Sequence, residues 1–341
     1  MIDIRQLLFS LSRVLALLVL CAAVAIVAPA FLSPQNLVNV LRQASLMIIL
    51  ATGLTAVILT GGIDLSVASL LALAACFSGM LMTEGIPWYL AALAALGLTT
   101  FCGLINGLMI AVVRLPAFIV TYGMLWIAQG FAVLVASSEV FYGFPPSFLF
   151  LGRGYLFGIP MPIVFMTLVA AAAWTLLHRT PLGREIYAMG ANPEAARLSG
   201  IDVKTNLIKV YTASGLLAGL AGLILTARMN AASAEVSADQ LLPAVAAVVI
   251  GGTSLFGGEG GIRGTVVGSL IMTVLINGMN LLNISPFWQL TAQGTVVIVA
   301  VLLDQGARAL ERRGEKRRPR VGSRPEASVE LPVEPTSAVS N

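Results

Sequence analysis

Long apolar runs separated by short polar segments cover almost the whole chain. An α-helix needs about 20 apolar residues to cross the hydrocarbon core of a bilayer, and many runs approach or exceed that length. The runs span residues 14–32, 37–60, 66–83, 88–113, 118–136, 160–178, 206–228, 242–257, 264–282 and 287–304. This pattern predicts an all-α polytopic membrane protein with about ten transmembrane helices.

Composition agrees with this prediction. Hydrophobic residues make up 58% of the 341 residues, charged residues make up 11%, and the mean hydropathy is +0.92. Little material is left for soluble domains. We therefore expect one transmembrane domain over residues 1–305, which includes a polar cytoplasmic segment at 179–205. The remainder, 306–341, is basic at first and then rich in Pro, Ser and Glu, which predicts a disordered tail.

Basic residues set the expected orientation, because Lys and Arg are retained on the cytoplasmic side of short loops. With the N-terminus inside, all but three of the 20 Lys and Arg residues fall inside. The three that fall outside are Arg42, Arg153 and Arg228. We therefore expect both termini to be cytoplasmic.

The sequence lacks the patterns of an enzyme or a metalloprotein. Cys21, Cys76 and Cys102 lie within apolar runs without metal-ligand spacing. No GxxxxGK[ST] motif occurs, and the glycine-rich residues 251–265 fit neither phosphate-binding fingerprint. We expect no metal, no cofactor and no nucleic-acid partner. Any driving force must come from a partner chain, an ion gradient or the solute itself.

The cytoplasmic segment carries the signals of two short capped helices. Thr180, with a proline next, begins the first helix, and Gly190 is expected to close it. Asn192, also with a proline next, begins the second helix, and Gly200 follows its end. Two capped helices favour a docking surface. A simple connection between spans remains the alternative.

The polar side chains inside the apolar runs are neutral. Asn106, Thr121, Asn277 and Gln293 are candidates for a solute path, because they can hydrogen-bond a hydroxyl-rich solute. Asparagine and threonine also hold helices together in lipid, and both interpretations stay open. No carboxylate falls securely in mid-membrane, which disfavours coupling to an ion gradient.

Two glycine pairs mark expected breaks between helices. Gly61 and Gly62 end one apolar run, and Gly251 and Gly252 interrupt another. At the first break, Asp64 or the serine two residues later is expected to cap the amides of the next helix. Broken helices form solute sites and gates in transporters. We interpret Asp64 as chiefly structural and close to the solute path.

A weak internal repeat accompanies these breaks. The tetrapeptide LING occurs at 104–107 and again at 275–278, in runs expected to cross in opposite directions. GxxxG pairs predict close packing of helices, and they occur at Gly103 and Gly107, Gly215 and Gly219, and Gly264 and Gly268. The pattern suits an inverted repeat in which spans 2–5 match spans 7–10.

Four segments together carry a family resemblance. They are GGIDLSVAS at 61–69, PAFIVTYG at 116–123, GREIYAMGANPEAARLSGIDV at 183–203 and AAVVIGGTSLFGGEGGIRGTVVGSLI at 246–271. In this order and spacing the chain resembles the ribose-type branch of bacterial ABC sugar-import permeases, within the branched-chain amino acid and monosaccharide permease superfamily. The resemblance covers roughly residues 30–305. Leu241 and Pro243 depart from it, because many members carry acidic residues there.

The resemblance implies a multi-pass permease of the bacterial inner membrane that imports a monosaccharide and is not itself an enzyme. The implied partners are a cytoplasmic sugar-type ABC ATPase, a periplasmic sugar-binding protein and a second permease chain, identical or different. The segment that family members insert into the ATPase matches Arg184, Gly190, Asn192, Glu194, Ala195, Ala196, Arg197 and Gly200. A gradient-driven carrier or passive facilitator of a small polar solute is the alternative, and it would need no docking helix.

Overall fold

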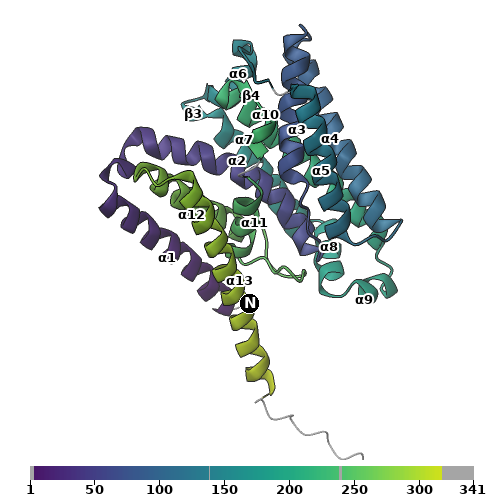
Figure 1. The fold of residues 1–341 in the computed structure, drawn as a ribbon. Helices are drawn as coiled ribbons and strands as arrows, with labels where there is room; N and C mark the ends of the chain where they lie inside the picture. The colour runs from purple at the N-terminus through teal and green to yellow at the C-terminus, as the bar shows by residue number, and fades with distance from the viewer. Residues whose placement is uncertain (1–3, 138, 238–239, 317–341) are drawn as a thin grey trace, which may run out of the picture. The chain divides into compact units, whose positions relative to one another are not determined.

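A computed structural model of the chain describes residues 4–137, 139–237 and 240–316. The described chain consists almost wholly of α-helices, with a few two-residue strands (Figure 1). The chain divides into two compact units, residues 1–301 and 302–341. All contacts described below lie within the first unit.

Ten helices coincide with the ten predicted runs. They are α1 Ile4–Val27, α2 Pro34–Leu59, α3 Val67–Thr83, α4 Trp88–Ala111, α5 Ala117–Ala136, α7 Met161–Arg179, α10 Val203–Met229, α11 Leu241–Ile250, α12 Ile262–Leu281 and α13 Pro286–Lys316. Among the described residues, six of these helices are long and apolar enough to cross a membrane, namely α2, α4, α5, α7, α10 and α12. The prediction of an all-α membrane protein is confirmed, and the predicted number of spans stays a prediction.

Helix α11 is shorter than the predicted run at 242–257. It ends at Ile250, because Gly252 takes a left-handed conformation with φ of 78° and the chain turns away. Ten residues of α-helix rise about 15 Å, roughly half the thickness of a hydrocarbon core. The apolar run therefore continues past the helix into an irregular loop, 251–261.

Short elements connect the long helices at both ends. They are the 3₁₀ helices Pro29–Leu32 and Ala234–Ser237, the helices α6 Pro146–Arg153, α8 Pro181–Ala191 and α9 Pro193–Leu198, and the strands β1 Phe141–Tyr142, β2 Tyr155–Leu156, β3 Ile159–Pro160 and β4 Ala231–Ala232. Strand β1 pairs antiparallel with β4, and β2 pairs with β3 in a hairpin. Figure 1 shows α6 and β4 at one end of the long helices and α8 and α9 at the other.

The interior is built around α10, which packs against α2, α3 and α4. Small residues allow this close approach. A Cβ atom added to Gly103 of α4 would lie 2.4 Å from the Tyr211 carbonyl oxygen, and one added to Gly215 would lie 2.4 Å from the Thr99 carbonyl oxygen. Close backbone contact through such residues replaces the hydrophobic driving force that lipid does not supply. The predicted GxxxG contact is confirmed for α4 and α10.

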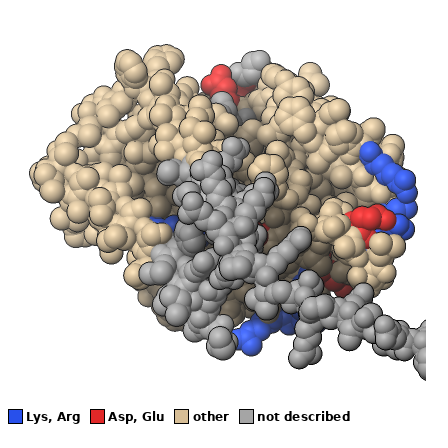
Figure 2. All heavy atoms as spheres, turned by 90° about the horizontal axis from the view of Figure 1, so that it is seen from below, with Lys and Arg blue, Asp and Glu red and all other residues tan. Residues whose placement is uncertain are grey.

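The outer helices turn apolar side chains outward. On α5 the exposed residues include Phe118, Tyr122 and Trp126, and α7 exposes Leu168. Most of the described surface visible in Figure 2 carries no Lys, Arg, Asp or Glu. An apolar exterior around a tightly packed interior is the arrangement expected when lipid surrounds the helices.

Helix α13 continues to Lys316, beyond residue 306, where we expected the disordered tail to begin. The segment from Asp304 to Lys316 is rich in Ala, Leu, Glu, Arg and Lys, which are strong helix formers. Residues 317–341, which hold the rest of the predicted tail, lie outside the described residues.

Candidate functional site

The break between α2 and α3 depends on two glycines. Gly61 takes a left-handed conformation with φ of 77°, directly after α2 ends. A Cβ atom added to Gly62 would lie 2.3 Å from the Tyr211 hydroxyl oxygen of α10. The first glycine supplies a backbone conformation and the second supplies space. Together they allow the chain to leave α2 and pass beneath α10.

Asp64 lies in this break and is completely buried. Its Oδ1 accepts hydrogen bonds from the amide and the hydroxyl of Ser66, at 3.0 and 2.6 Å, and its Oδ2 accepts one from the Ser214 hydroxyl at 2.8 Å. We expected Asp64 or Ser66 to cap the amides of α3, and this detail is wrong. Asp64 accepts no amide beyond that of Ser66, and Ser66 makes no side-chain cap. The Ser66 hydroxyl instead donates to Asp64 and accepts from Asn106 of α4, while the other Asp64 oxygen bonds Ser214 of α10.

Two candidates for the solute path bond this same break. The Asn106 amide of α4 donates to the Ser66 hydroxyl at 3.0 Å, and the Thr121 hydroxyl of α5 donates to the Ile63 carbonyl at 3.1 Å. The buried Asn106 Oδ1 and Tyr211 hydroxyl have no hydrogen-bond partner among the described residues. The break is thus tied to α4, α5 and α10 at once.

The second break follows α11. The Arg13 guanidinium of α1 donates to the Gly251 carbonyl at 2.7 Å, which satisfies one of the free carbonyls at the end of α11. Gly251 also packs directly on the backbone of Gly264 in α12. The pair Gly251 and Gly252 therefore marks the end of a helix, as the sequence predicts.

Helix α8 ends where the two breaks meet. The Gly258 amide donates to the Leu59 carbonyl at 2.9 Å, and this bond joins the second break to the end of α2. A Cβ atom added to Gly190 would lie 1.8 Å from the Leu59 oxygen and 2.4 Å from the Gly258 nitrogen. We call the contact among Leu59, Gly190 and Gly258 the α8 junction.

Two side-chain bonds fix α8 in this position. The Tyr187 hydroxyl donates to the Gly260 carbonyl at 2.9 Å, and the Asn206 amide of α10 donates to the Glu185 carboxylate at 2.6 Å. Gly190 was expected to close the helix, yet α8 continues to the next residue. Gly190 does not form a left-handed turn. Because it has no side chain, it can lie in close contact with both breaks.

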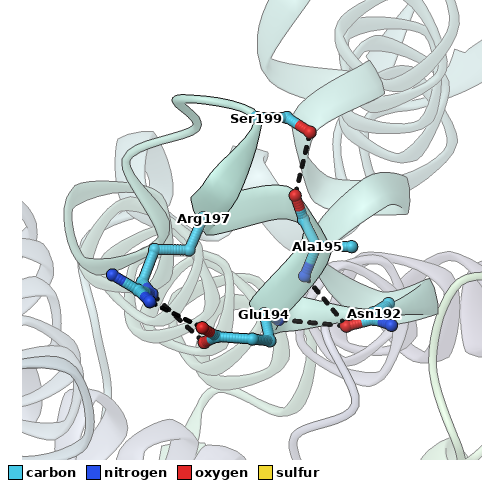
Figure 3. Close-up of polar contacts among 5 residues, drawn as sticks. All are labelled: Asn192, Glu194, Ala195, Arg197 and Ser199. Atoms are coloured by element: carbon cyan, nitrogen blue, oxygen red, sulfur yellow. Dashed lines mark hydrogen bonds and ion pairs between the residues drawn. The ribbon is translucent and has the colours of Figure 1, made fainter. Parts of the chain in front are cut away.

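Helix α9 projects from the end of α8 and is capped as predicted (Figure 3). The Asn192 side chain accepts hydrogen bonds from the amides of Glu194 and Ala195, at 3.1 and 3.0 Å. Arg197 donates to the Glu194 carboxylate and holds the pKa of that carboxyl below its ordinary value. Gly200 follows the helix with φ of 86°.

Most of α9 is exposed. Among the predicted docking residues only Ala196 is buried, whereas Arg184 on α8 and the rest of the charged set face outward. Leu198 is 75% exposed, and our sequence analysis missed it. An apolar side chain at the end of a short helix, next to the polar Ser199, is the signal that could have identified it.

Comparison with known proteins places the chain in a family. The profile described as "Branched-chain amino acid transport system / permease component" matches residues 36–302. The chain belongs to this permease family.

Named relatives match the chain over most of its length. The permease is 44% identical to the "Ribose import permease protein RbsC" of Escherichia coli K12 and 42% identical to the protein of that name in Bacillus subtilis. These matches cover 85% of the chain and 92% and 91% of the two proteins. It is 37% identical to the "Fructose import permease protein FrcC" of Rhizobium meliloti, over 82% of the chain and 80% of that protein. No solved structure matches it.

The other two path candidates of the permease lie apart from Asp64. Asn277 of α12 exchanges two hydrogen bonds with Asn36 at the start of α2, at 3.0 and 2.9 Å. Gln293 lines a cavity of about 650 Å³ between α2, α10, α12 and α13. Other polar side chains in its wall are Gln43, Arg228, Gln240, Thr273, Asn280 and Gln289. The five path candidates therefore occupy three separate places.

Among the described residues, no group of three or more His, Cys, Asp or Glu side chains could hold a metal ion. The permease is a membrane component of a transport system and not an enzyme.

We predict that removing the α10 contact to Asp64 destabilises the permease. Ser214→Ala deletes the donor to a buried carboxylate oxygen, which costs about 1–3 kcal/mol. Thr212→Ala is the matched control, because the Thr212 hydroxyl bonds only within α10, to the Ile208 carbonyl. Thermal melting of the purified permease should show a lower midpoint for Ser214→Ala than for the control. Equal midpoints would contradict the structural role of Asp64.

Proposed function

We propose that the chain is the permease subunit of an ATP-binding cassette importer that moves a monosaccharide into the cytoplasm. The relatives named above import ribose and fructose, and a further relative is a D-allose transport permease. ATP hydrolysis belongs to a separate cytoplasmic chain. The observation that carries the mechanism is the α8 junction, where one exposed element contacts the breaks of two membrane helices.

The exposed side of α8 and α9 is the proposed ATPase docking surface. Leu198 supplies an apolar contact, and Arg184, Glu194 and Arg197 surround it with charge. A partner that pushes or pulls α9 moves the end of α8, and Gly190 passes this motion to Leu59 and Gly258 at once. A gradient-driven carrier would leave this exposed, capped helix without a function.

The polar cavity beside Gln293 is the proposed solute site of one permease chain. Its volume lies within the range of small-molecule pockets. Amide side chains such as those of Gln293 and Gln43 donate and accept hydrogen bonds, as the hydroxyl groups of a sugar require. Asp64, Asn106 and Thr121 instead hold the break between α2 and α3 in place, and Asn277 holds α12 to α2.

The opposite end carries the proposed contact for a periplasmic sugar-binding protein. Arg153 donates to the Arg228 carbonyl at 2.8 Å, and Arg42 donates to the Tyr155 hydroxyl at 2.7 Å. No described carboxylate forms an ion pair with any of these three arginines. An acidic surface on the binding protein would supply the missing charge. We also propose that a second permease chain, identical or different, completes the importer.

We propose ten spans, with α11 as a half-length span, and an inverted repeat of α2–α5 and α10–α13. Three helix contacts have counterparts under this correspondence. In this repeat α2, α3 and α4 correspond to α10, α11 and α12. The contact of α4 with α10 then matches that of α12 with α2, and the contact of α3 with α4 matches that of α11 with α12. Likewise, the contact of α3 with α10 matches that of α11 with α2. Both termini then lie in the cytoplasm, on the inner side of a bacterial inner membrane.

Leu198→Asp should uncouple the importer. Loss of a buried leucine contact costs about 1.5–3 kcal/mol, so ATPase binding should weaken at least about tenfold. Uptake and stimulated ATP hydrolysis by the reconstituted importer should fall, while melting of the permease alone stays unchanged. Ser199→Ala is the control, since it alters the next exposed side chain without removing apolar surface. Wild-type uptake by Leu198→Asp would refute docking through α9.

Thiol labelling tests the orientation. In a background without Cys21, Cys76 and Cys102, a cysteine at Ser147 of α6 should react with an impermeant reagent added to intact cells. A cysteine at Ser199 should react only after the cells are opened. The reverse pattern would overturn the proposed orientation, and labelling of both from outside would overturn the span count.

A further inference from the structure

A cationic and aromatic cluster lies at the end of α7, next to the start of α12. The guanidinium carbons of Arg179 and Arg263 lie 5.8 and 5.2 Å from the ring centroid of Trp174. The ring of His178 stacks on the same indole, with centroids 5.4 Å apart. Neither arginine forms an ion pair with a described carboxylate. Two positive charges thus share one indole ring without a compensating carboxylate among the described residues.

An apolar pocket opens directly beside this cluster. Its volume is about 420 Å³, and its wall is formed by Ala170, Trp174, Ile262, Arg263 and Val266. Arg263 lines the pocket, and Arg179 lies over the ring of Trp174, which also lines it. The pocket therefore combines an aliphatic wall with two neighbouring guanidinium groups.

We propose that this pocket binds an anionic phospholipid of the leaflet next to α8. An acyl chain fits the aliphatic wall between α7 and α12, and the phosphate group accepts hydrogen bonds from the two guanidinium groups. Basic pockets between membrane helices bind anionic headgroups in this way. A free phosphate ion would leave the aliphatic wall exposed, so the structure favours a lipid.

The position of the pocket gives the lipid an influence on coupling. Arg179 is the last residue of α7, and only Thr180 separates it from α8. His178 also contacts the ring of Tyr187, with centroids 6.4 Å apart, and Tyr187 donates to the Gly260 carbonyl in the second break. A bound headgroup therefore steadies α7, α8 and the 251–261 loop together. Lipid binding itself depends on no part of the proposed transport function.

Native mass spectrometry of the full-length permease in detergent tests the proposal. Phosphatidylglycerol and phosphatidylcholine with identical acyl chains are added in equal amounts, and bound lipid is counted. The wild type should prefer phosphatidylglycerol. Each basic residue near an anionic headgroup contributes about fivefold, so the double variant Arg179→Gln, Arg263→Gln should lose at least about tenfold of this preference. Arg114→Gln, which changes an exposed arginine on another loop, should keep it.

Fluorescence gives a second readout that does not depend on stability. A variant with Trp174 as its only tryptophan, carrying Trp88→Phe, Trp126→Phe and Trp288→Phe, should be quenched more strongly by brominated phosphatidylglycerol than by brominated phosphatidylcholine. Equal quenching by the two lipids, or an unchanged preference in the double variant, would overturn the proposal. Displacement of the lipid by the same concentration of inorganic phosphate would also overturn it.

Discussion

The hydrogen bond from the Gly258 amide to the Leu59 carbonyl is the contact on which the arrangement depends. It joins the end of α2 to the loop after α11, two segments almost 200 residues apart in sequence. Gly190 lies against both atoms of this bond, so only a residue without a side chain fits. A single short element, α8, therefore contacts both breaks in the membrane helices.

The two breaks lie on the same side for a topological reason. In the proposed inverted repeat, corresponding loops of the two halves fall on opposite sides of the membrane. The α2–α3 and α11–α12 loops do not correspond, and for that reason they can meet at one end of the molecule. The buried Asp64 network fixes the first break to α4, α5 and α10, and Arg13 fixes the second to α1. Helix α8 thus contacts two breaks that are fixed to helices of both halves.

Local signals in the sequence predicted local structure well. The ten helices lie on the ten apolar runs, and the capping residues Thr180 and Asn192 begin α8 and α9 as expected. Each of these features depends on neighbours within one or two turns. The apolar run at 242–257 predicted a helix that is too long. Its composition does not reveal that Gly252 takes a left-handed conformation, with which the helix ends early.

Contacts between distant segments could not be predicted in this way. Asp64 bonds Ser214, 150 residues later, and Asn277 bonds Asn36, 241 residues earlier. Neither partner is marked by its own surroundings in the sequence. Gly190 looked like a helix terminator because glycine often has that role. Its contact with Leu59 and Gly258 becomes visible only when three segments are placed together.

The ratio of solute molecules imported to ATP hydrolysed tests the role of the α8 junction most directly. Gly190→Ala adds one methyl group between Leu59 and Gly258. Gly97→Ala adds the same group on α4, where no described atom outside the adjoining helix backbone lies within 4 Å of it. In the reconstituted importer, the junction predicts that Gly190→Ala lowers this ratio severalfold and that Gly97→Ala leaves it at the wild-type value. A wild-type ratio in Gly190→Ala would contradict transmission through the junction.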